Sequence, residues 1–358
     1  MKTLMFYINS LRRGGAERVL LQLAERFAGE GYRAVFVTSF RADDEYPVPE
    51  TVLRLSMEEE NLPQSRLRKN ISRISALRKL CREYEPEALI AFMAEPNFRA
   101  VLATAGLPVK TIISVRNAPD REYAGRLFRF VGQHILPLAD GCVFQTGDAK
   151  LWFPEKLQRK STVIFNQVSP GFFEEAPAAE KKDIYAVGRL NHQKNFPMLI
   201  RAFAGLENCT DRLIIHGEGE KRAELEALIS QLHMEGRVLL PGLSSDVAKD
   251  IRGAKLFVLS SDFEGMPNAL LEAMALGLCC ISTDCPCGGP RAVIEDGVNG
   301  CLIPVGDEEA LRKAMQGLLA DDEKRRSVAA NARESAKKFS PDEIFSQWKN
   351  YVESVTGK

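Results

Sequence analysis

Short apolar runs alternate with longer amphipathic segments along almost the whole chain, and this alternation limits the fold more than any other feature of the sequence. The intervening segments, such as 16–30 and 195–206, are long enough for crossover helices. Strands separated by helices pair in parallel and form sheets covered by helices on both faces. The sequence therefore predicts an α/β protein. The candidate strands are 4–8, 34–38, 88–92, 111–115, 141–144 and 161–164, then 184–187, 212–216, 238–241, 256–260, 279–283 and 300–303.

The alternation is interrupted at residues 167–182, a polar stretch containing Pro and Ala that indicates a linker. Six candidate strands lie on each side, and a chain of 358 residues is long enough for two domains. We predict a first domain over residues 1–168 and a second over residues 169–340, each Rossmann-like with a doubly wound parallel sheet. A final helix starts at Pro341 and runs to about Ser354.

Composition and charge exclude several classes of protein. No apolar run reaches the roughly 20 residues that span a bilayer, and the N-terminus lacks the features of a signal peptide, so we expect a cytoplasmic protein. The net charge is zero, but residues 1–170 hold 25 Lys and Arg against 19 Asp and Glu, which favours an anionic partner. No nucleic-acid-binding motif accompanies this charge, so we expect no nucleic acid. The five cysteines between 279 and 301 lack zinc-ligand spacing, and we interpret them as buried free thiols.

One candidate binding feature follows the strand at 256–260. A loop carrying Glu264 and Gly265 leads into a helix that we expect to have Pro267 at its first position and Gly277 just past its end. The first N–H groups of a helix have no partner within it and can bind phosphate. We expect a diphosphate to bind the unpaired N–H groups near Asn268, Ala269 and Leu270.

Two glutamates flank the start of this helix. Glu272 lies about 7.5 Å along the helix axis, where its carboxylate suits the paired hydroxyls of a ribose. Glu264 precedes the helix and could face a transferred sugar. The alternative interpretation is that both are solvated charges at a helix end.

Glycines and cations follow other candidate strands. Gly188 permits a tight turn, after which Arg189 and Lys194 could hold a diphosphate and stabilise it as a leaving group. Gly217 adds a glycine after a second strand. The loop containing Gly14 and Gly15, after the first strand, lets the backbone approach a ligand where a helix opens. Surface charge and tight turns without a ligand are the alternative interpretations of each feature taken alone.

Together these motifs resemble the retaining glycosyltransferases of family 4, or group 1, which have the two-domain GT-B architecture with an interdomain cleft. The segment from Glu264 to Glu272 matches the family's Glu-x7-Glu motif, and residues 187–190 with Lys194 match its basic phosphate pair. Residues 14–17 match its N-terminal glycine loop. Residues 285–300 resemble its C-terminal signature. The resemblance covers nearly the whole chain and is most specific over 184–305.

The resemblance implies a role for each motif. Arg189 and Lys194 would hold the donor diphosphate and Glu264 would contact the donor sugar near its reacting carbon, so these three are the expected catalytic residues. The last helix, 341–358, would pack back onto the first domain. The implied donor-binding residues are Gly14, Gly15, Gly188, Gly217, Leu243, Gly265, Met266, Asn268, Ala269, Leu270 and Glu272.

One departure from the family lies in the first domain. Many relatives carry a His after the strand at 111–115, whereas this chain has Arg116 and Asn117. Either could contact the sugar or the acceptor, but neither is a good general base, and an ordinary loop charge is the alternative for Arg116. We assign no catalytic base.

By this resemblance, we expect retaining transfer of a hexose or N-acetylhexosamine from a UDP-sugar, with a GDP-sugar as the alternative donor. The implied acceptor is a glycan or a polyprenyl-linked glycan, as in bacterial synthesis of lipid-linked oligosaccharide, capsule or lipopolysaccharide. The chain has no Asp-x-Asp motif, and its cations can stabilise a diphosphate, so we expect no required metal or other cofactor. The rival interpretations are a sugar-nucleotide 2-epimerase on the same scaffold and a non-catalytic subunit of a polysaccharide assembly complex.

A basic amphipathic segment occupies residues 66–82. Its apolar stripe lies among seven Lys and Arg residues and could rest on anionic lipid at the inner face of the plasma membrane. A helix packed on the core, with a solvated basic face, is the alternative. The stripe consists of Leu67, Ile71, Ile74, Leu77 and Leu80.

Overall fold

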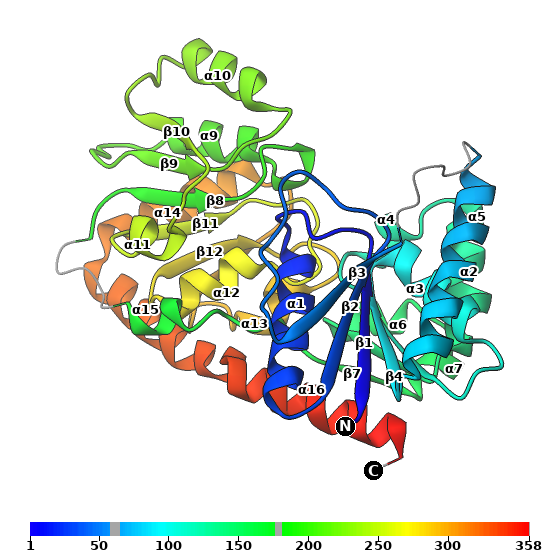
Figure 1. Ribbon diagram of the computed structural model, residues 1–358. Helices are drawn as coiled ribbons and strands as arrows, with labels where there is room; N and C mark the ends of the chain where they lie inside the picture. The colour runs from blue at the N-terminus through cyan, green and yellow to red at the C-terminus, as the bar shows by residue number, and fades with distance from the viewer. Residues whose placement is uncertain (58–64, 176–180, 358) are drawn as a thin grey trace. The chain divides into compact units, whose positions relative to one another are not determined.

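The computed structural model describes residues 1–57, 65–175 and 181–357. The chain forms two compact units, one made of Met1–Asn166 with Asp342–Lys358 and the other of Gln167–Pro341. Each unit contains a parallel sheet (Figure 1), which confirms the predicted α/β fold class. Within the predicted linker 167–182, residues 171–174 form the short helix α8 (Gly171–Glu174). Residues 176–180 of that segment lie outside the described ranges.

Seven strands form the sheet of the first unit: β1 (Thr3–Ile8), β2 (Arg33–Thr38), β3 (Val52–Ser56), β4 (Ala88–Phe92), β5 (Lys110–Ser114), β6 (Gly141–Phe144) and β7 (Ser161–Val163). Their order is β3-β2-β1-β4-β5-β6-β7, and all neighbours are parallel. The six predicted strands omit β3, which pairs with β2 at the sheet edge. Of the side chains of β3, Val52 alone is fully buried, so the strand lacks the continuous apolar run that marks a central strand.

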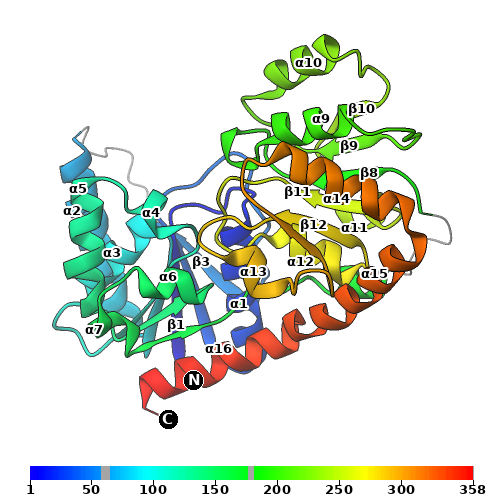
Figure 2. The same ribbon diagram turned by 180° about the vertical axis from the view of Figure 1, so that it is seen from behind.

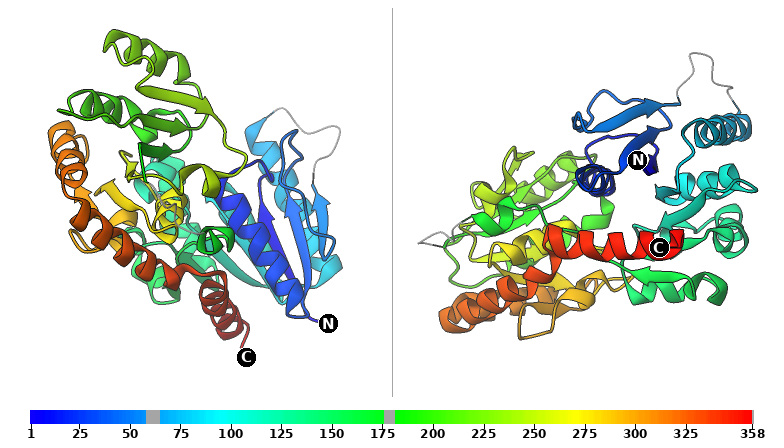
Figure 3. Two further views of the ribbon diagram at one scale, coloured as in Figure 1. Left: turned by 90° about the vertical axis from the view of Figure 1, so that its left-hand side faces the viewer. Right: turned by 60° about the horizontal axis from the view of Figure 1, so that its bottom comes forward.

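Helices cover both faces of this sheet. α1 (Gly15–Gly29) and α16 (Pro341–Thr356) contribute to the core on one face, where Trp348 lies against Phe92 with ring centroids 5.7 Å apart. α2 (Arg66–Tyr84) and α3 (Ala94–Thr104) contribute to the core on the other face. Figure 3 shows α1 alongside the strands of its own unit. The shorter helices are α4 (Pro119–Glu122), α5 (Arg126–Phe130), a π-helical turn (Val131–Ile135), a 3-10 turn (Leu136–Leu138), α6 (Gly147–Leu151) and α7 (Glu155–Gln158).

Six strands form the sheet of the second unit: β8 (Ile184–Val187), β9 (Leu213–His216), β10 (Val238–Gly242), β11 (Leu256–Leu259), β12 (Cys279–Thr283) and β13 (Cys301–Ile303). Their order is β10-β9-β8-β11-β12-β13, again parallel throughout. These are the six strands that the sequence predicts after residue 182, with ends shifted by one residue or less.

The helices of the second unit also lie on both sides of its sheet. α9 (Phe196–Ala204), α10 (Arg222–Gln231) and α14 (Glu308–Ala320) share one apolar core with the strands. α12 (Asn268–Ala275) and α15 (Asp322–Ala336) contact each other and β12, as the reverse view in Figure 2 shows. Shorter elements are α11 (Val247–Ile251), α13 (Gly289–Val293) and 3-10 turns at His192–Lys194 and Lys337–Phe339. Among the described residues, no helix has both the length and the apolarity to cross a membrane.

The strand order identifies one edge of each sheet as the place where a ligand is expected. Beside β1 and beside β8 the order reverses, so that β1 neighbours β4 and β8 neighbours β11. In doubly wound sheets, ligands bind at the carboxyl ends of the strands at such a switch point. The loop containing Gly14 follows β1, the loop containing Gly188 follows β8, and the loop containing Glu264 follows β11. The main candidate motifs therefore lie at the two switch points.

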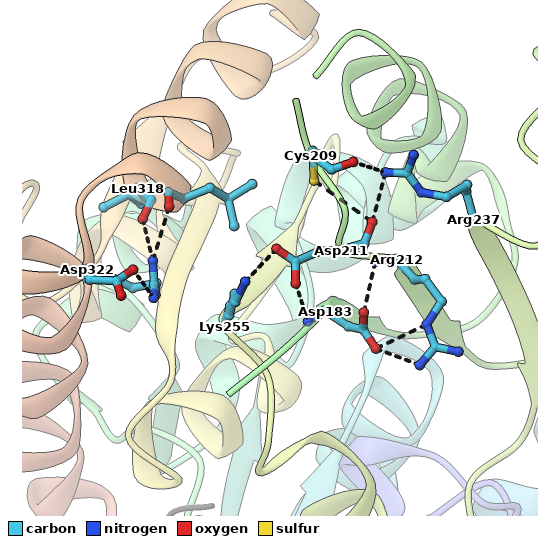
Figure 4. A network of polar contacts seen from close by, with 10 residues as sticks. Asp183, Cys209, Asp211, Arg212, Arg237, Lys255, Leu318 and Asp322 are labelled. Carbon is cyan, nitrogen blue, oxygen red and sulfur yellow. Dashed lines mark hydrogen bonds and ion pairs between the residues drawn. The ribbon is translucent and has the colours of Figure 1, made fainter. Parts of the chain in front are cut away.

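A polar network closes the opposite, amino-terminal edge of the second sheet (Figure 4). Asp183 precedes β8 and accepts hydrogen bonds from the backbone N–H (2.9 Å) and the side-chain Nη2 (2.8 Å) of Arg212. Asp211 accepts a bond from Lys255 Nζ at 2.8 Å. Burial raises the pKa of Asp183, but the hydrogen bonds from Arg212 outweigh burial and the net pKa is lowered. Because these charges are paired with one another, this edge has a structural role.

Candidate active site

The loop that carries Glu264 is fixed to the loop that follows β12. The Glu264 N–H donates to the carbonyl of Pro286 (2.8 Å), and the Cys287 N–H donates back to the carbonyl of Glu264 (3.0 Å). Gly289 allows the two loops to approach, because a Cβ there would collide with the carbonyl oxygen of Gly265. The backbone around Glu264 is therefore held from both sides.

The carboxylate of Glu264 is buried and has three hydrogen-bond donors around it. Lys194 Nζ lies 2.6 Å from Oε1, Ser261 Oγ lies 2.7 Å from the same oxygen, and Gln193 Nε2 lies 3.2 Å from Oε2. The motifs predict separate roles for Lys194 and Glu264, whereas the structure joins them in an ion pair. Sequence reasoning missed Gln193 and Ser261, although the position of Gln193 next to Lys194 and of Ser261 after a buried strand was a usable signal.

Lys194 reaches Glu264 from the 3-10 turn that follows β8. Asn191 caps this turn by accepting a hydrogen bond from the Lys194 N–H (3.3 Å), and Ser260 Oγ donates to the Lys194 carbonyl (2.8 Å). The aliphatic part of Lys194 lies over Gly188, where a Cβ would press against it. A larger residue at 188 would require the Lys194 side chain to shift, so Gly188 leaves room for Lys194 in its present position.

Arg189 precedes Lys194 by five residues but does not share the buried environment of the Lys194–Glu264 ion pair. Its side chain is exposed and makes no hydrogen bond or ion pair with any residue that the structure describes. The glycines near it pack closely: the Gly217 N–H donates to the carbonyl of Gly242 (2.8 Å), and a Cβ at Gly217 would collide with the carbonyl of Gly188. Leu243 follows Gly242 and is exposed. The ends of β8, β9 and β10 thus pack closely together, and the Arg189 side chain at this edge is exposed to solvent.

The first turn of α12 differs in detail from the prediction. Pro267 is the N-cap residue, with φ −76° and ψ 102°, rather than the first helical residue. The Leu270 N–H donates to the carbonyl of Pro267 (3.0 Å), so the expectation that this amide is unpaired is wrong. The Ala269 N–H makes no hydrogen bond within the described chain. Gly277, with φ 66°, follows the end of the helix as predicted.

The two glutamates of the motif are both buried, which excludes the interpretation that they are solvated charges at a helix end. Glu272 lies in the second turn of α12, on the helix whose start carries Ala269. Gly265 and Met266 are buried before this helix, and Asn268 is half-buried at its first position.

The remaining predicted residues belong to the first unit. Gly14 is the N-cap residue of α1, and Gly15 is its first residue, one position before the predicted start. Arg116 and Asn117 follow β5, where Arg116 is buried and Asn117 is half-buried. In the second unit, by contrast, Lys194 and Glu264 are brought into direct contact.

Two family models match consecutive parts of the chain. "Glycosyltransferase Family 4" matches residues 13–171, and "Glycosyl transferases group 1" matches residues 171–335. Together they span the glycine loop after β1, the cations after β8 and both glutamates. The chain therefore belongs to the group 1, family 4 glycosyltransferases, and it is an enzyme of this class.

Two transferases of Campylobacter jejuni are similar over nearly the full length. The "GalNAc-alpha-(1->4)-GalNAc-alpha-(1->3)-diNAcBac-PP-undecaprenol alpha-1,4-N-acetyl-D-galactosaminyltransferase" is 27% identical and covers 99% of each chain. The "N-acetylgalactosamine-N,N'-diacetylbacillosaminyl-diphospho-undecaprenol 4-alpha-N-acetylgalactosaminyltransferase" is 29% identical over 95% of this chain and 96% of the relative.

Solved structures share the fold over the whole chain. HepE of Anabaena, in complex with UDP, aligns with a TM-score of 0.83 at 20% identity and covers 99% of this chain and 100% of its own. The lipopolysaccharide outer core galactosyltransferase WaaB aligns with a TM-score of 0.77 at 20% identity over 99% of each chain. These neighbours confirm the GT-B class that the resemblance predicts.

Proposed function

We propose that the enzyme transfers a hexose or an N-acetylhexosamine from a UDP-sugar to a lipid-linked glycan, with retention of anomeric configuration and without a required metal ion. The observation that carries the proposal is the buried ion pair of Lys194 and Glu264, between loops at the carboxyl ends of β8 and β11. Arg189 and the α12 N-terminus belong to the same two loops.

These groups match the charges that develop during transfer. As the bond from the sugar to the diphosphate breaks, Arg189, Lys194 and the first N–H groups of α12 would stabilise the negative leaving group. The sugar becomes oxocarbenium-like, and the Glu264 carboxylate would stabilise its positive charge. The acceptor oxygen bonds to the sugar on the same face, and its proton passes to an oxygen of the leaving phosphate. This scheme needs no second carboxylate as nucleophile.

The relatives support the choice of substrates. The names of the two Campylobacter jejuni enzymes describe N-acetylgalactosamine transfer to undecaprenol-linked glycans, and the HepE structure contains UDP. For this chain they favour a UDP-N-acetylhexosamine donor and a polyprenyl-linked acceptor.

The test is to incubate the enzyme with UDP-sugars and a polyprenyl-linked glycan, then determine the anomeric configuration of the product by NMR. We expect a retained configuration and equal rates with and without EDTA. Arg189→Ala should weaken UDP binding by about tenfold or more, as expected for loss of a charged contact to phosphate. An inverted product would contradict the mechanism, and conversion of the UDP-sugar to its 2-epimer without acceptor would contradict the transfer.

We further propose that α2 places the enzyme on an anionic membrane at the cytoplasmic face. Its apolar stripe is divided: Leu77 is buried, whereas Leu67 and Ile71 are 71% and 58% exposed. Packing on the core, the alternative interpretation, therefore explains the second half of the helix. It does not explain the exposed Leu67 and Ile71, which lie near the exposed Arg68. An exposed apolar pair with basic neighbours suits anionic lipid.

Sedimentation with vesicles tests this placement. The enzyme should bind vesicles that contain phosphatidylglycerol and should not bind phosphatidylcholine alone. The double variant Leu67→Gln/Ile71→Gln should lose the binding, while Leu151→Gln, an exposed leucine elsewhere in the same unit, should keep it. Equal binding by both variants would exclude α2 as the membrane contact.

A further inference from the structure

Arg116 is a buried cation that forms no ion pair with any carboxylate among the residues the structure describes. It lies two residues beyond β5, at the carboxyl edge of the first sheet, and is 8% exposed. Within the described part of the chain, its Nη2 has no hydrogen-bond partner, and its Nη1 reaches Ser114 Oγ at 3.5 Å, the limit of a hydrogen bond. Its guanidinium carbon lies 4.1 Å from the centre of the Phe92 ring. The ring contact fixes the guanidinium and leaves donor groups unused.

Two other buried arginines have the ion pairs and hydrogen bonds expected of a guanidinium with a structural role. Arg99, 1% exposed, pairs with Glu95 at 2.6 Å and donates to Asn9 and Asn70. Arg325, 8% exposed, pairs with Asp322 and donates to the carbonyl of Leu318. Of the three arginines that are buried among the described residues, Arg116 is the one without a carboxylate.

Burial of the unpaired Arg116 guanidinium costs free energy unless a ligand supplies the counter-charge. An unpaired charge that is taken out of water loses its hydration, and only a counter-charge or hydrogen bonds offset that loss. Burial lowers the pKa of Arg116 to about 9, so the group is still a cation at neutral pH. A planar guanidinium with free N–H groups is suited to an oxyanion, above all a phosphate. Its position at a strand end, next to the switch-point strand β4, is where a ligand is expected.

We propose that Arg116 binds a phosphate oxygen of a substrate and that this phosphate is its missing counter-charge. The inference rests on the proposed function, which supplies two phosphate-bearing substrates, the nucleotide donor and the polyprenyl diphosphate acceptor. The chemistry is the same in both cases, and binding assays separate the sources.

The first experiment measures thermal unfolding of the ligand-free protein. Arg116→Met removes an uncompensated charge and keeps an unbranched side chain over Phe92, so its Tm should equal or exceed that of the wild type. Arg99→Met, the matched control, breaks a paired and hydrogen-bonded network and should lower the Tm. A fall in the Tm of Arg116→Met as large as that of Arg99→Met would overturn the proposal, because Arg116 would then be structural.

The second experiment measures binding by calorimetry with UDP, uridine, a short prenyl diphosphate and the corresponding prenyl alcohol. Arg116→Met should raise the Kd of at least one diphosphate about tenfold or more and leave uridine and the alcohol unchanged. Arg116→Lys should lie between the wild type and Arg116→Met. A loss for UDP assigns the donor phosphate, and a loss for the prenyl diphosphate assigns the acceptor phosphate.

The outcomes also separate this inference from the proposed function. Unchanged affinity for both diphosphates in Arg116→Met, in an enzyme that still transfers sugar, overturns the role of Arg116 alone. A wild-type protein that binds neither diphosphate overturns both proposals. A loss of affinity that extends to uridine and the alcohol contradicts a phosphate contact and indicates a general distortion.

Discussion

At the scale of single residues, the candidate site depends on charges whose partners come from separate loops. Glu264 is buried beneath Lys194, Ser261 and Gln193, and its geometry is set by these donors. A carboxylate held in this way is oriented before any substrate arrives. Because Glu264 is buried, each of these donors helps to determine the orientation of its carboxylate.

We predict that Glu264→Gln lowers kcat by about 100-fold or more, since it removes the negative charge that we propose to face the reacting sugar. The Kd for UDP should change little, because Arg189 and the α12 N-terminus remain. Steady-state kinetics and calorimetry measure the two quantities. Glu308→Gln, which alters an exposed pair with Arg201, is the matched control and should leave kcat unchanged. A parallel loss of UDP binding in Glu264→Gln would place Glu264 on the nucleotide instead.

A second residue-scale prediction concerns Glu122, which accepts a hydrogen bond from the Ala94 N–H (2.8 Å) through one oxygen. Its other oxygen has no partner among the residues that the structure describes. Burial raises its pKa from 4.5 to about 7 and outweighs the opposing effect of the Ala94 N–H. The folded state therefore keeps this proton up to about pH 7, whereas the unfolded state loses it near pH 4.5. Stability is lost as the pH rises through that window.

Glu122→Gln should therefore unfold at higher urea concentration than the wild type at pH 8, by a free energy on the order of 1 to 3 kcal/mol, and at a similar concentration at pH 4.5. Urea unfolding at the two pH values measures the difference. Glu155→Gln, an exposed glutamate paired with Arg159, should show no such pH dependence. An equal effect of Glu122→Gln at both pH values would mean that the carboxyl is not the titrating group.

At the scale of elements, the site depends on two loops, the one that carries Glu264 and the one that follows β12. These loops approach so closely that a side chain at the contact would keep them apart. Gly289, at the start of α13, faces the carbonyl oxygen of Gly265 in the loop that carries Glu264. Gly317, inside α14, has no atom within 4 Å of the position a Cβ would take. The two glycines therefore have opposite roles, although the sequence alone does not distinguish them.

We predict that Gly289→Ala displaces the Glu264 loop, lowering both stability and kcat. Gly317→Ala should raise the free energy of unfolding by roughly 0.5 to 1 kcal/mol, because Ala loses less backbone entropy in a helix, and should leave kcat unchanged. Urea unfolding and steady-state kinetics of the two variants provide the check. Wild-type kcat in Gly289→Ala would show that the loop can move without affecting the reaction.

The helices and strands also differ in how well they could be predicted from the sequence. Central strands and the glycine that ends α12 were predictable, because buried apolar runs and helix caps are local signals. β3 was not, since an edge strand with one fully buried side chain has no such run. The Lys194–Glu264 ion pair was not predictable either, because it joins residues 70 positions apart whose contact depends on the neighbouring order of β8 and β11. The burial of Arg116 has the same origin, in packing that the sequence does not display.

At the scale of the whole molecule, the two units differ in continuity. The second is a continuous stretch, whereas the first needs the end of the chain to complete its core. Trp348 in α16 is 1% exposed and joins the same apolar cluster as Phe27 in α1. Loss of α16 therefore affects the first unit directly.

We predict that Trp348→Ala destabilises the first unit by roughly 3 to 5 kcal/mol, the usual cost of deleting a buried aromatic ring. Hydrogen exchange followed by mass spectrometry should show faster exchange in β1, β2 and β4, with β8 and β9 unchanged. Phe203→Ala, which removes a buried ring of the second unit, should give the reverse pattern. Uniformly faster exchange throughout both units in either variant would show that they unfold as one.

The dependence of the first unit on α16 has a consequence for how the protein is made. Residues 342–358 are synthesised after the whole of the second unit, so the sheet face that α16 covers remains without this helix while the second unit is being made. The second unit, being continuous, can fold before α16 is complete. A nascent chain thus carries an incomplete first domain ahead of a complete second one, and the apolar face of the first stays open to aggregation until α16 has been synthesised.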